Sequence, residues 1–196
     1  FIGTNLAHKL LNEGKSVTIL DSLQRPGVEA NLDWLRRTHG SDLNIMVADV
    51  RNRYKVQEAV RNAGFVYHLA AQVAVTTSYE QPYYDFETNI LGTLNLLESI
   101  RNTAHKPPVL FTSTNKVYGN LAGLDLMPNG NRYKMNQRKV DENQKLDLHS
   151  PYGCSKGSAD AYMLDYARMY GLKTVVFRMS CIYGPHQLGT EDQGWV

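Results

Sequence analysis

The chain has 196 residues, 42% hydrophobic and 20% charged, which is enough for one domain with a sizeable core. Its 21 basic and 19 acidic residues form no run of like charge, which excludes an obvious nucleic-acid or membrane surface and favours a small-molecule partner. No apolar stretch reaches transmembrane length, and Cys154 and Cys181 are too few for a disulfide framework, so we expect a reducing, cytoplasmic setting and no metal.

The first half of the sequence predicts alternating helices and strands. A helix with leucines at helical spacing comes first and stops at Gly14. Short β-branched or apolar runs at 17–20, 44–48 and 65–70 predict strands, and the pattern over 51–63 predicts a helix between the last two.

The second half continues the alternation. A stripe of Phe86, Ile90, Leu94, Leu97 and Ile100 predicts a long core-facing helix over 85–102. A strand at 109–113, a helix at 152–170 and a strand at 174–178 follow. This order predicts an α/β fold with a doubly wound parallel sheet, Rossmann-like, covered by helices on both faces.

The chain opens at Phe1 without an initiator Met or signal-peptide pattern and closes without a helix cap, so we expect a fold truncated at both ends. Residues 1–180 would form a dinucleotide-binding domain that lacks its first strand, and 181–196 would begin a substrate-binding domain. The polar segment 120–148 is too long for a simple connection, and its place before the helix at 152–170 favours a functional role.

The ends of the predicted strands carry residues suited to a dinucleotide. Gly3 at the start of the first helix would let a pyrophosphate approach the backbone N–H groups. Asp21 closes the next strand, where a carboxylate accepts hydrogen bonds from the adenosine ribose and repels a 2′-phosphate. This favours NAD over NADP, although Arg25 in the following loop could offset the charge; the alternative for Asp21 is a solvated turn residue.

Two further strand ends belong to this edge. Asp49 and Val50 would border the adenine, or Asp49 would cap the next helix. Small side chains in the segment Leu69, Ala70, Ala71 and Gln72 would leave room for the pyrophosphate and ribose of a cofactor. The alternative for Ala70 and Ala71 is tight helix packing, which is compatible with this role. His68, inside the strand, is expected to be a core histidine rather than a catalyst.

Tyr152 and Lys156 lie four residues apart at the start of a predicted helix and would share one face. An ammonium beside the phenol would stabilise the phenolate, so that the tyrosine could act as a base near neutral pH. Ser113 and Thr114 end the preceding strand, where a hydroxyl could share a substrate hydroxyl with Tyr152. The alternative for the pair is a surface helix pair without function.

The sequence resembles the extended short-chain dehydrogenases/reductases, the NAD-dependent epimerase/dehydratase family, along its whole length. The resemblance rests on Gly3, Asp21, His68–Ala71, Asn89–Thr93, Val117–Gly119 and Tyr152-x-x-x-Lys156. It implies that Thr114, Tyr152 and Lys156 are catalytic and that Asn89, Ser113 and Arg178 lie at a bound NAD. It also implies a nucleotide-sugar substrate near Thr114, Asn115, His186 and Gln187, and a homo-oligomer formed through the helices near 85–102 and 152–170.

The dehydratases of this family carry an Asp-Glu pair after the Ser/Thr, where this chain has Asn115 and Lys116, so dehydration is disfavoured. Four separated strings, at 72–78, 113–119, 149–157 and 192–196, resemble a subgroup that inverts C2 of a CDP-sugar by transient oxidation. A UDP-sugar 4-epimerase and a non-catalytic NAD-binding regulator remain as alternatives.

Overall fold

The computed structural model describes residues 1–121, 124–135 and 140–189. The helices are α1 (Ile2–Asn12), α2 (Val28–His39), α3 (Arg53–Val60), α4 (Val75–Glu80), α5 (Pro82–Phe86), α6 (Gly92–Arg101) and α7 (Ser150–Tyr170). The strands are β1 (Val17–Asp21), β2 (Leu43–Val47), β3 (Val66–His68), β4 (Val109–Thr114), β5 (Leu126–Asn129), β6 (Arg132–Met135) and β7 (Thr174–Met179). Among these described helices, none combines the length and the apolar character that crossing a membrane requires.

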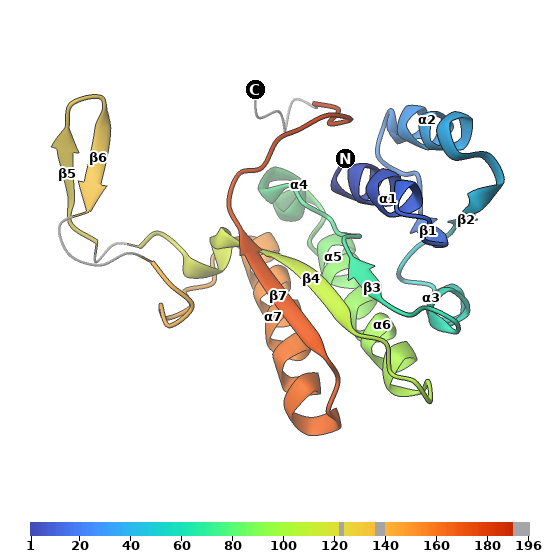
Figure 1. The fold of residues 1–196 in the computed structure, drawn as a ribbon. Coiled ribbons are helices and arrows are strands. Elements are labelled where there is room, and N and C mark those ends of the chain that lie inside the picture. Colours follow the sequence, from blue (N-terminus) through green and yellow to red (C-terminus); the bar gives the residue numbers. More distant parts are fainter. Residues whose placement is uncertain (122–123, 136–139, 190–196) are drawn as a thin grey trace.

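The strands of the body pair in parallel, as predicted. β1 pairs with β2, and β4 lies between β3 and β7 (Figure 1). Each parallel pair is joined by a helix-containing crossover, so the α/β class is confirmed. The described parallel strands form two separate sheets, β1–β2 and β3–β4–β7, rather than one continuous sheet.

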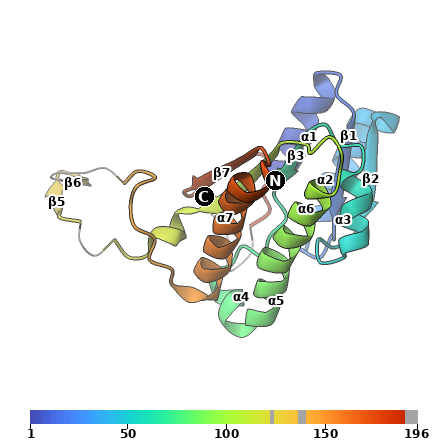
Figure 2. The same cartoon turned by 90° about the horizontal axis from the view of Figure 1, so that it is seen from below.

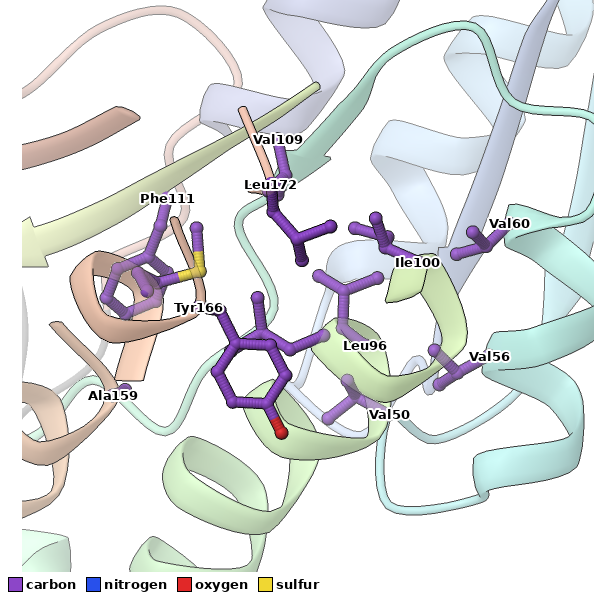
Figure 3. Packing of buried hydrophobic residues seen from close by; sticks show 12 residues of the cluster. Val50, Val56, Val60, Leu96, Ile100, Val109, Phe111, Ala159, Tyr166 and Leu172 are labelled. Atoms are coloured by element: carbon purple, nitrogen blue, oxygen red, sulfur yellow. The ribbon is translucent and has the colours of Figure 1, made fainter. Parts of the chain in front are cut away.

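Two hydrophobic clusters hold the body together. The larger one joins α3, α6 and α7 to β4 and includes Leu97, Phe111 and Met163, which are at most 1% exposed (Figure 3). The smaller one joins α1 and α2 to β2 through Ala7, Leu11, Leu35 and Leu43. The larger cluster therefore fixes α7 beneath β4, next to α6 (Figure 2).

The second face of the β3–β4–β7 sheet is less covered than the sequence pattern predicted. Val175 and Phe177 alternate with the residues that face α7 and are 46% and 49% exposed. Tyr67 on β3 is 37% exposed. The apolar runs predicted strands buried on both faces, but in the described residues this sheet buries one face mainly against α6 and α7.

The predicted long helix over 85–102 is divided into α5, a π-helical turn at Glu87–Leu91, and α6. The wide turn rotates the first part relative to the apolar stripe, so Phe86 is 50% exposed while Asp85 and Asn89 are at most 2% exposed. The expectation that Phe86 faces the core is therefore wrong. π turns of this kind occur often at functional sites.

The sequence pattern also missed α2, α4 and the antiparallel hairpin β5–β6. The hairpin lies within the polar segment 120–148 and stands away from the body (Figure 1). Gly130 and Asn131 form its two-residue turn, with Gly130 at a φ of +61°. The functional role expected for this segment stays a prediction, and residues 122–123 and 136–139 lie outside the described residues.

Candidate active site

The carboxyl end of β4 and the first turns of α7 bring two hydroxyl groups together. Thr114 ends β4, and its Oγ1 accepts a hydrogen bond from the Lys116 backbone N–H at 3.2 Å. The Tyr152 hydroxyl lies close enough to the Thr114 side chain for Thr114 to lower the pKa of Tyr152. Tyr152 and Thr114 are 8% and 7% exposed, so the pair lies at the boundary between the core and the strand ends.

Lys156 lies one helical turn after Tyr152 and faces the same strand. Its Nζ donates to the Thr112 carbonyl oxygen at 2.6 Å and lies 4.2 Å from the centre of the Phe111 ring. The side chain is 3% exposed, and this burial lowers the pKa of Lys156 to about 7, although the carboxylates of Asp160 and Asp85 act in the opposite direction. Tyr152 and Lys156 therefore share the face of α7 that meets β4.

The pKa of Tyr152 departs from the sequence-based expectation. Burial raises it above its usual value, the hydrogen bond to Thr114 lowers it, and the carboxylate of Asp85 raises it further. Lys156 is not among the groups that shift this pKa, and its ammonium donates to the backbone of β4. Burial is the largest effect, and the stabilisation of the phenolate by Lys156 stays a prediction.

Asn89, in the π-helical turn, connects the loop after β3 to α7. Its Oδ1 accepts from the Gln72 N–H at 2.9 Å. Its Nδ2 lies 3.1 Å from Gln72 O, 3.2 Å from Asp85 Oδ1 and 3.0 Å from Ser155 Oγ. Asn89 thus holds the two elements that border the Tyr152–Thr114 pair.

Ser113 and Arg178 lie beside the pair but are engaged in the core. Both bind the buried carboxylate of Asp160, Ser113 Oγ donating at 2.9 Å and Arg178 Nε at 2.8 Å. Arg178 also donates to the Tyr118 hydroxyl at 3.1 Å. These contacts join β4, β7 and α7, and a role of either residue at a cofactor stays a prediction.

The predicted cofactor residues lie at the ends of β1, β2 and β3. A Cβ added to Gly3 would lie 3.6 Å from Leu69 Cδ1, so the start of α1 adjoins the exit of β3, where Ala70 and Ala71 follow. No side chain caps the N-terminus of α1. Asp21 is exposed, and its Oδ1 accepts from the Leu23 N–H at 2.8 Å. This arrangement leaves backbone donors and a carboxylate at one edge, which fits a dinucleotide.

Asp49 and Val50 are placed differently from each other. The Asp49 carboxylate binds the Arg51 guanidinium at 2.8 Å, and this hydrogen bond lowers the pKa of Asp49. Asn52, rather than Asp49, caps α3, because its Oδ1 accepts from the N–H groups of Tyr54 and Lys55. The helix-cap alternative for Asp49 is therefore wrong. Val50 is 8% exposed and packs in the larger hydrophobic cluster.

The predicted substrate residues do not all come together. Asn115 Oδ1 lies 3.5 Å from Thr114 Oγ1, beside the Tyr152–Thr114 pair. The His186 ring packs on Trp34 of α2, with 4.1 Å between ring centres, and Gln187 accepts from the Gly184 N–H at 3.3 Å. Arg25 donates to Leu188 O at 3.3 Å in the same region. Residues 184–188 therefore adjoin α2 and the loop after β1.

Sequence reasoning missed Asp85, Asp160 and the core role of Arg178. Asp85 and Asp160 are 1% and 0% exposed. Asp160 stands four residues after Lys156, a helical spacing that could have pointed to it. Nothing in the local pattern marks Asp85, because its burial depends on the π turn and on α7. The described residues contain no group of three or more His, Cys, Asp or Glu side chains that could hold a metal ion.

Comparison with known proteins shows the family to which the chain belongs. Residues 1–191 match the family model described as GDP-mannose 4,6 dehydratase. The chain is 45% identical over 200 residues to CDP-paratose 2-epimerase of Salmonella typhi, covering 100% of this chain and 59% of that protein. The structure of the UDP-glucose 4-epimerase of Thermus thermophilus complexed with NAD is 33% identical, with a TM-score of 0.76 over 95% of this chain and 54% of that one.

The dTDP-glucose 4,6-dehydratase DesIV of Streptomyces venezuelae, with NAD and TYD bound, is 28% identical with a TM-score of 0.80, covering 95% of this chain and 55% of that one. The chain thus spans between half and three fifths of the length of these relatives. Both epimerases and dehydratases occur among them, on one Rossmann-like fold. With 191 of its residues matched to the family model, the chain belongs to the GDP-mannose 4,6 dehydratase family, a group of nucleotide-sugar epimerases and dehydratases of the short-chain dehydrogenase/reductase type.

Proposed function

We propose that this chain is the cofactor-binding part of an NAD-dependent nucleotide-sugar epimerase that inverts C2 of a CDP-sugar, as in the conversion of CDP-paratose to CDP-tyvelose. The observation that carries the proposal is the buried Tyr152 side chain beside Thr114, with Lys156 one turn away on the same face of α7. The 45% identity to a CDP-paratose 2-epimerase supports the choice of sugar and carbon. We assign residues 181–196 to the start of the substrate-binding domain, although 190–196 lie outside the described residues.

In this mechanism Tyr152 accepts the proton of the substrate hydroxyl as the carbon that bears it is oxidised. Thr114 holds the same oxygen by a hydrogen bond and so fixes its distance from the phenol. Bound NAD would supply the hydride acceptor and a positive charge near the phenol. Because burial raises the pKa of Tyr152 in this structure, that charge and the Lys156 ammonium are needed to make the phenol a usable base.

Re-reduction then proceeds in the opposite sense. Tyr152 returns the proton to the oxygen after the keto sugar has turned over in the pocket and presents its other face. The same phenol takes up the proton in the first half-reaction and returns it in the second. Inversion therefore needs only a sugar that can rotate, with no second acid or base.

We assign the cofactor to the edge formed by Gly3, Asp21 and the segment Leu69–Gln72, with Asp49 and Val50 at the adenine and Asn89 near the nicotinamide. The uncapped start of α1 can bind a pyrophosphate through its N–H groups. The exposed Asp21 carboxylate would accept from ribose hydroxyls and repel a 2′-phosphate. Arg25 donates to Leu188 O, which reduces its availability to offset that charge.

Dehydration is disfavoured by the two residues that follow Thr114. Elimination of water needs an acid and a base in addition to the tyrosine. The Asn115 amide has no titratable proton, and Lys116 is exposed at the turn after β4. Neither residue supplies the carboxyl pair that the elimination requires.

The deciding experiment uses the full-length protein and locates the inverted carbon by NMR of the product. With a CDP-6-deoxy sugar carrying deuterium at C2, we expect inversion at C2 with the label retained at that carbon, since the hydride leaves and returns within one active site. Inversion at C4 of UDP-glucose would instead assign the alternative, which the 33% identity to a UDP-glucose 4-epimerase structure keeps open. Loss of water from a nucleotide hexose that still carries its 6-hydroxyl would show a dehydratase.

We further propose that the whole protein pairs with a second copy through α5, α6 and α7. Apolar side chains lie exposed on these elements, among them Tyr83 at 84%, Phe86 at 50% and Leu164 at 37%. Exposed apolar side chains gathered on neighbouring helices commonly mark a contact between proteins. Sedimentation velocity should show a dimer or larger species that Phe86→Asp converts to monomer, whereas Phe65→Asp, on the loop before β3, should leave it unchanged.

A further inference from the structure

The loop after β2 carries a carboxylate and a guanidinium that bind each other. Three hydrogen bonds join Arg51 to Asp49: the backbone N–H and Nε donate to Oδ1 at 2.8 and 3.0 Å, and Nη2 donates to Oδ2 at 2.8 Å. The two side chains are 30% and 25% exposed, so both are partly withdrawn from water. Arg51 therefore fixes the plane of the Asp49 carboxylate through a contact of two side-chain nitrogens with both oxygens.

Arg51 is itself held by α5, the π-helical turn and α6. Its Nη1 donates to Glu87 Oε2 at 3.1 Å, and its Cζ lies 5.1 Å from the centre of the Tyr84 ring. The Tyr84 hydroxyl donates to Gln24 Oε1 at 2.9 Å, in the loop after β1. Asn95 Nδ2 donates to Arg51 O at 3.0 Å, which holds the backbone as well. A planar guanidinium with two carboxylate partners and a ring against it has little freedom to turn.

These contacts leave one acceptor position on the Asp49 carboxylate. An ionised carboxylate can accept about four hydrogen bonds, shared equally between its oxygens. In the part of the chain that the structure describes, Arg51 fills both positions at Oδ1 and one at Oδ2. The direction of the remaining position is fixed, because the carboxylate cannot rotate without breaking its contacts with the guanidinium. A ligand that reaches Asp49 must therefore offer a hydrogen-bond donor at that place.

The base of the cofactor offers such a donor. Adenine carries an amino group at C6, whereas hypoxanthine carries a carbonyl oxygen there, which is an acceptor. A carboxylate held in one orientation favours the amino group and disfavours the carbonyl, since two acceptor oxygens repel each other and both lose a partner. A carboxylate that is free to rotate can turn away from the carbonyl and discriminates less.

We propose that Arg51 is a positioning residue of the cofactor site: held by Glu87 and Tyr84, it orients the Asp49 carboxylate so that the site selects a purine with an amino group at C6. The proposal rests on the proposed function, which places the adenine of NAD at Asp49. Arg51 acts through that carboxylate and not by contact with the purine. It therefore affects the choice of base more than the total affinity.

The test is a competition between NAD and nicotinamide hypoxanthine dinucleotide for the full-length protein. The protein is incubated with an excess of both in equal amounts until the bound ratio is constant, and the bound dinucleotides are then released by denaturation and quantified by chromatography. We expect the wild type to bind NAD in an excess of about 10-fold or more, as a hydrogen bond to a charged group predicts. In Arg51→Met this excess should fall by at least about fivefold. Arg53→Met removes an exposed arginine of α3 and should keep the wild-type ratio.

The ratio separates positioning from a purely structural role. A site that is merely loosened binds both dinucleotides more weakly by the same factor, so a wild-type ratio in Arg51→Met would overturn the proposal. Arg51→Lys covers the case in which Arg51→Met does not fold, because an ammonium keeps the charge but lacks the planar fork that binds both oxygens. We expect an intermediate ratio in Arg51→Lys, and an unchanged one would be equally decisive against the proposal.

Asp49→Ala distinguishes the role of Arg51 from the placement of the adenine. This variant removes the carboxylate and should abolish the preference for NAD. A preference lost in Asp49→Ala but kept in Arg51→Met would overturn the role of Arg51 alone. A preference kept in both, or absent from the wild type, would also remove the adenine from Asp49. Epimerisation of the sugar is measured separately, so it can stand or fail independently of these ratios.

Discussion

Arg178 forms two hydrogen bonds to the carboxylate of Asp160, from Nε to Oδ2 at 2.8 Å and from Nη2 to Oδ1 at 3.1 Å. The Asp160 side chain is fully buried and that of Arg178 is 15% exposed. This ion pair ties β7 to α7 within one turn of Lys156.

The first prediction concerns this pair. Arg178→Met leaves a buried, unpaired carboxylate and should lower the free energy of unfolding by about 3–5 kcal/mol. The double variant Arg178→Met/Asp160→Leu should recover part of the loss, because it removes the stranded charge. Chemical denaturation measures both, and Asp33→Asn at the exposed Arg36–Asp33 pair is the control with a small effect. A double variant less stable than the single one would contradict this view.

A second prediction concerns Gly92, the first residue of α6. A Cβ there would lie 2.7 Å from Val50 Cγ1, inside the larger hydrophobic cluster. Gly92→Ala should therefore lower the free energy of unfolding by about 1–3 kcal/mol, although alanine is the better helix former. Val50→Ala should lessen the effect of Gly92→Ala, and Gly64→Ala, where nothing lies within 4 Å, serves as the control in thermal unfolding. Equal effects at both glycines would argue against the contact.

His68 gives a prediction for acid stability. Burial, with a smaller effect from Lys156, lowers its pKa from 6.5 to about 3. Between these values the unfolded chain binds a proton that the folded chain does not, so stability falls as pH falls through this window, by up to about 1.4 kcal/mol per pH unit. The neutral His68→Gln should show a shallower loss in urea unfolding at several pH values. The exposed His105→Gln is the matched control, and a wild-type slope in His68→Gln would refute the assignment.

Catalysis by the Tyr152–Thr114 pair yields the fourth prediction. In the full-length protein Tyr152→Phe should reduce kcat by about 100- to 10,000-fold with little change in KM, since the proton acceptor is lost while the ring remains. Thr114→Val should also reduce kcat, and Thr114→Ser should restore most of it. Tyr162→Phe, farther along α7 and 40% exposed, is the control for the loss of a hydroxyl. Substantial epimerisation by Tyr152→Phe would instead assign the proton transfer to another group.

The order of elements was predictable because their signals are local. Apolar runs marked β1, β2, β4 and β7, and the four-residue spacing of Tyr152 and Lys156 placed both on one face of α7. The residue that caps α3 was not predictable in the same way. Asp49 and Asn52 are both good cap residues, and the choice of Asn52 follows from the Asp49 carboxylate being held by Arg51.

The sequence by itself determined the alternation of strands and helices, the family resemblance and the identity of the residues at the end of β4. The tertiary structure decided which carboxylates are buried, that Lys156 donates to Thr112, and that the pKa of Tyr152 is raised rather than lowered. The reason is physical: the position of a residue in the repeat of its helix or strand fixes which face of that element its side chain occupies. Its solvation and its charged neighbours depend on elements that are distant in sequence, as α5 is from α7.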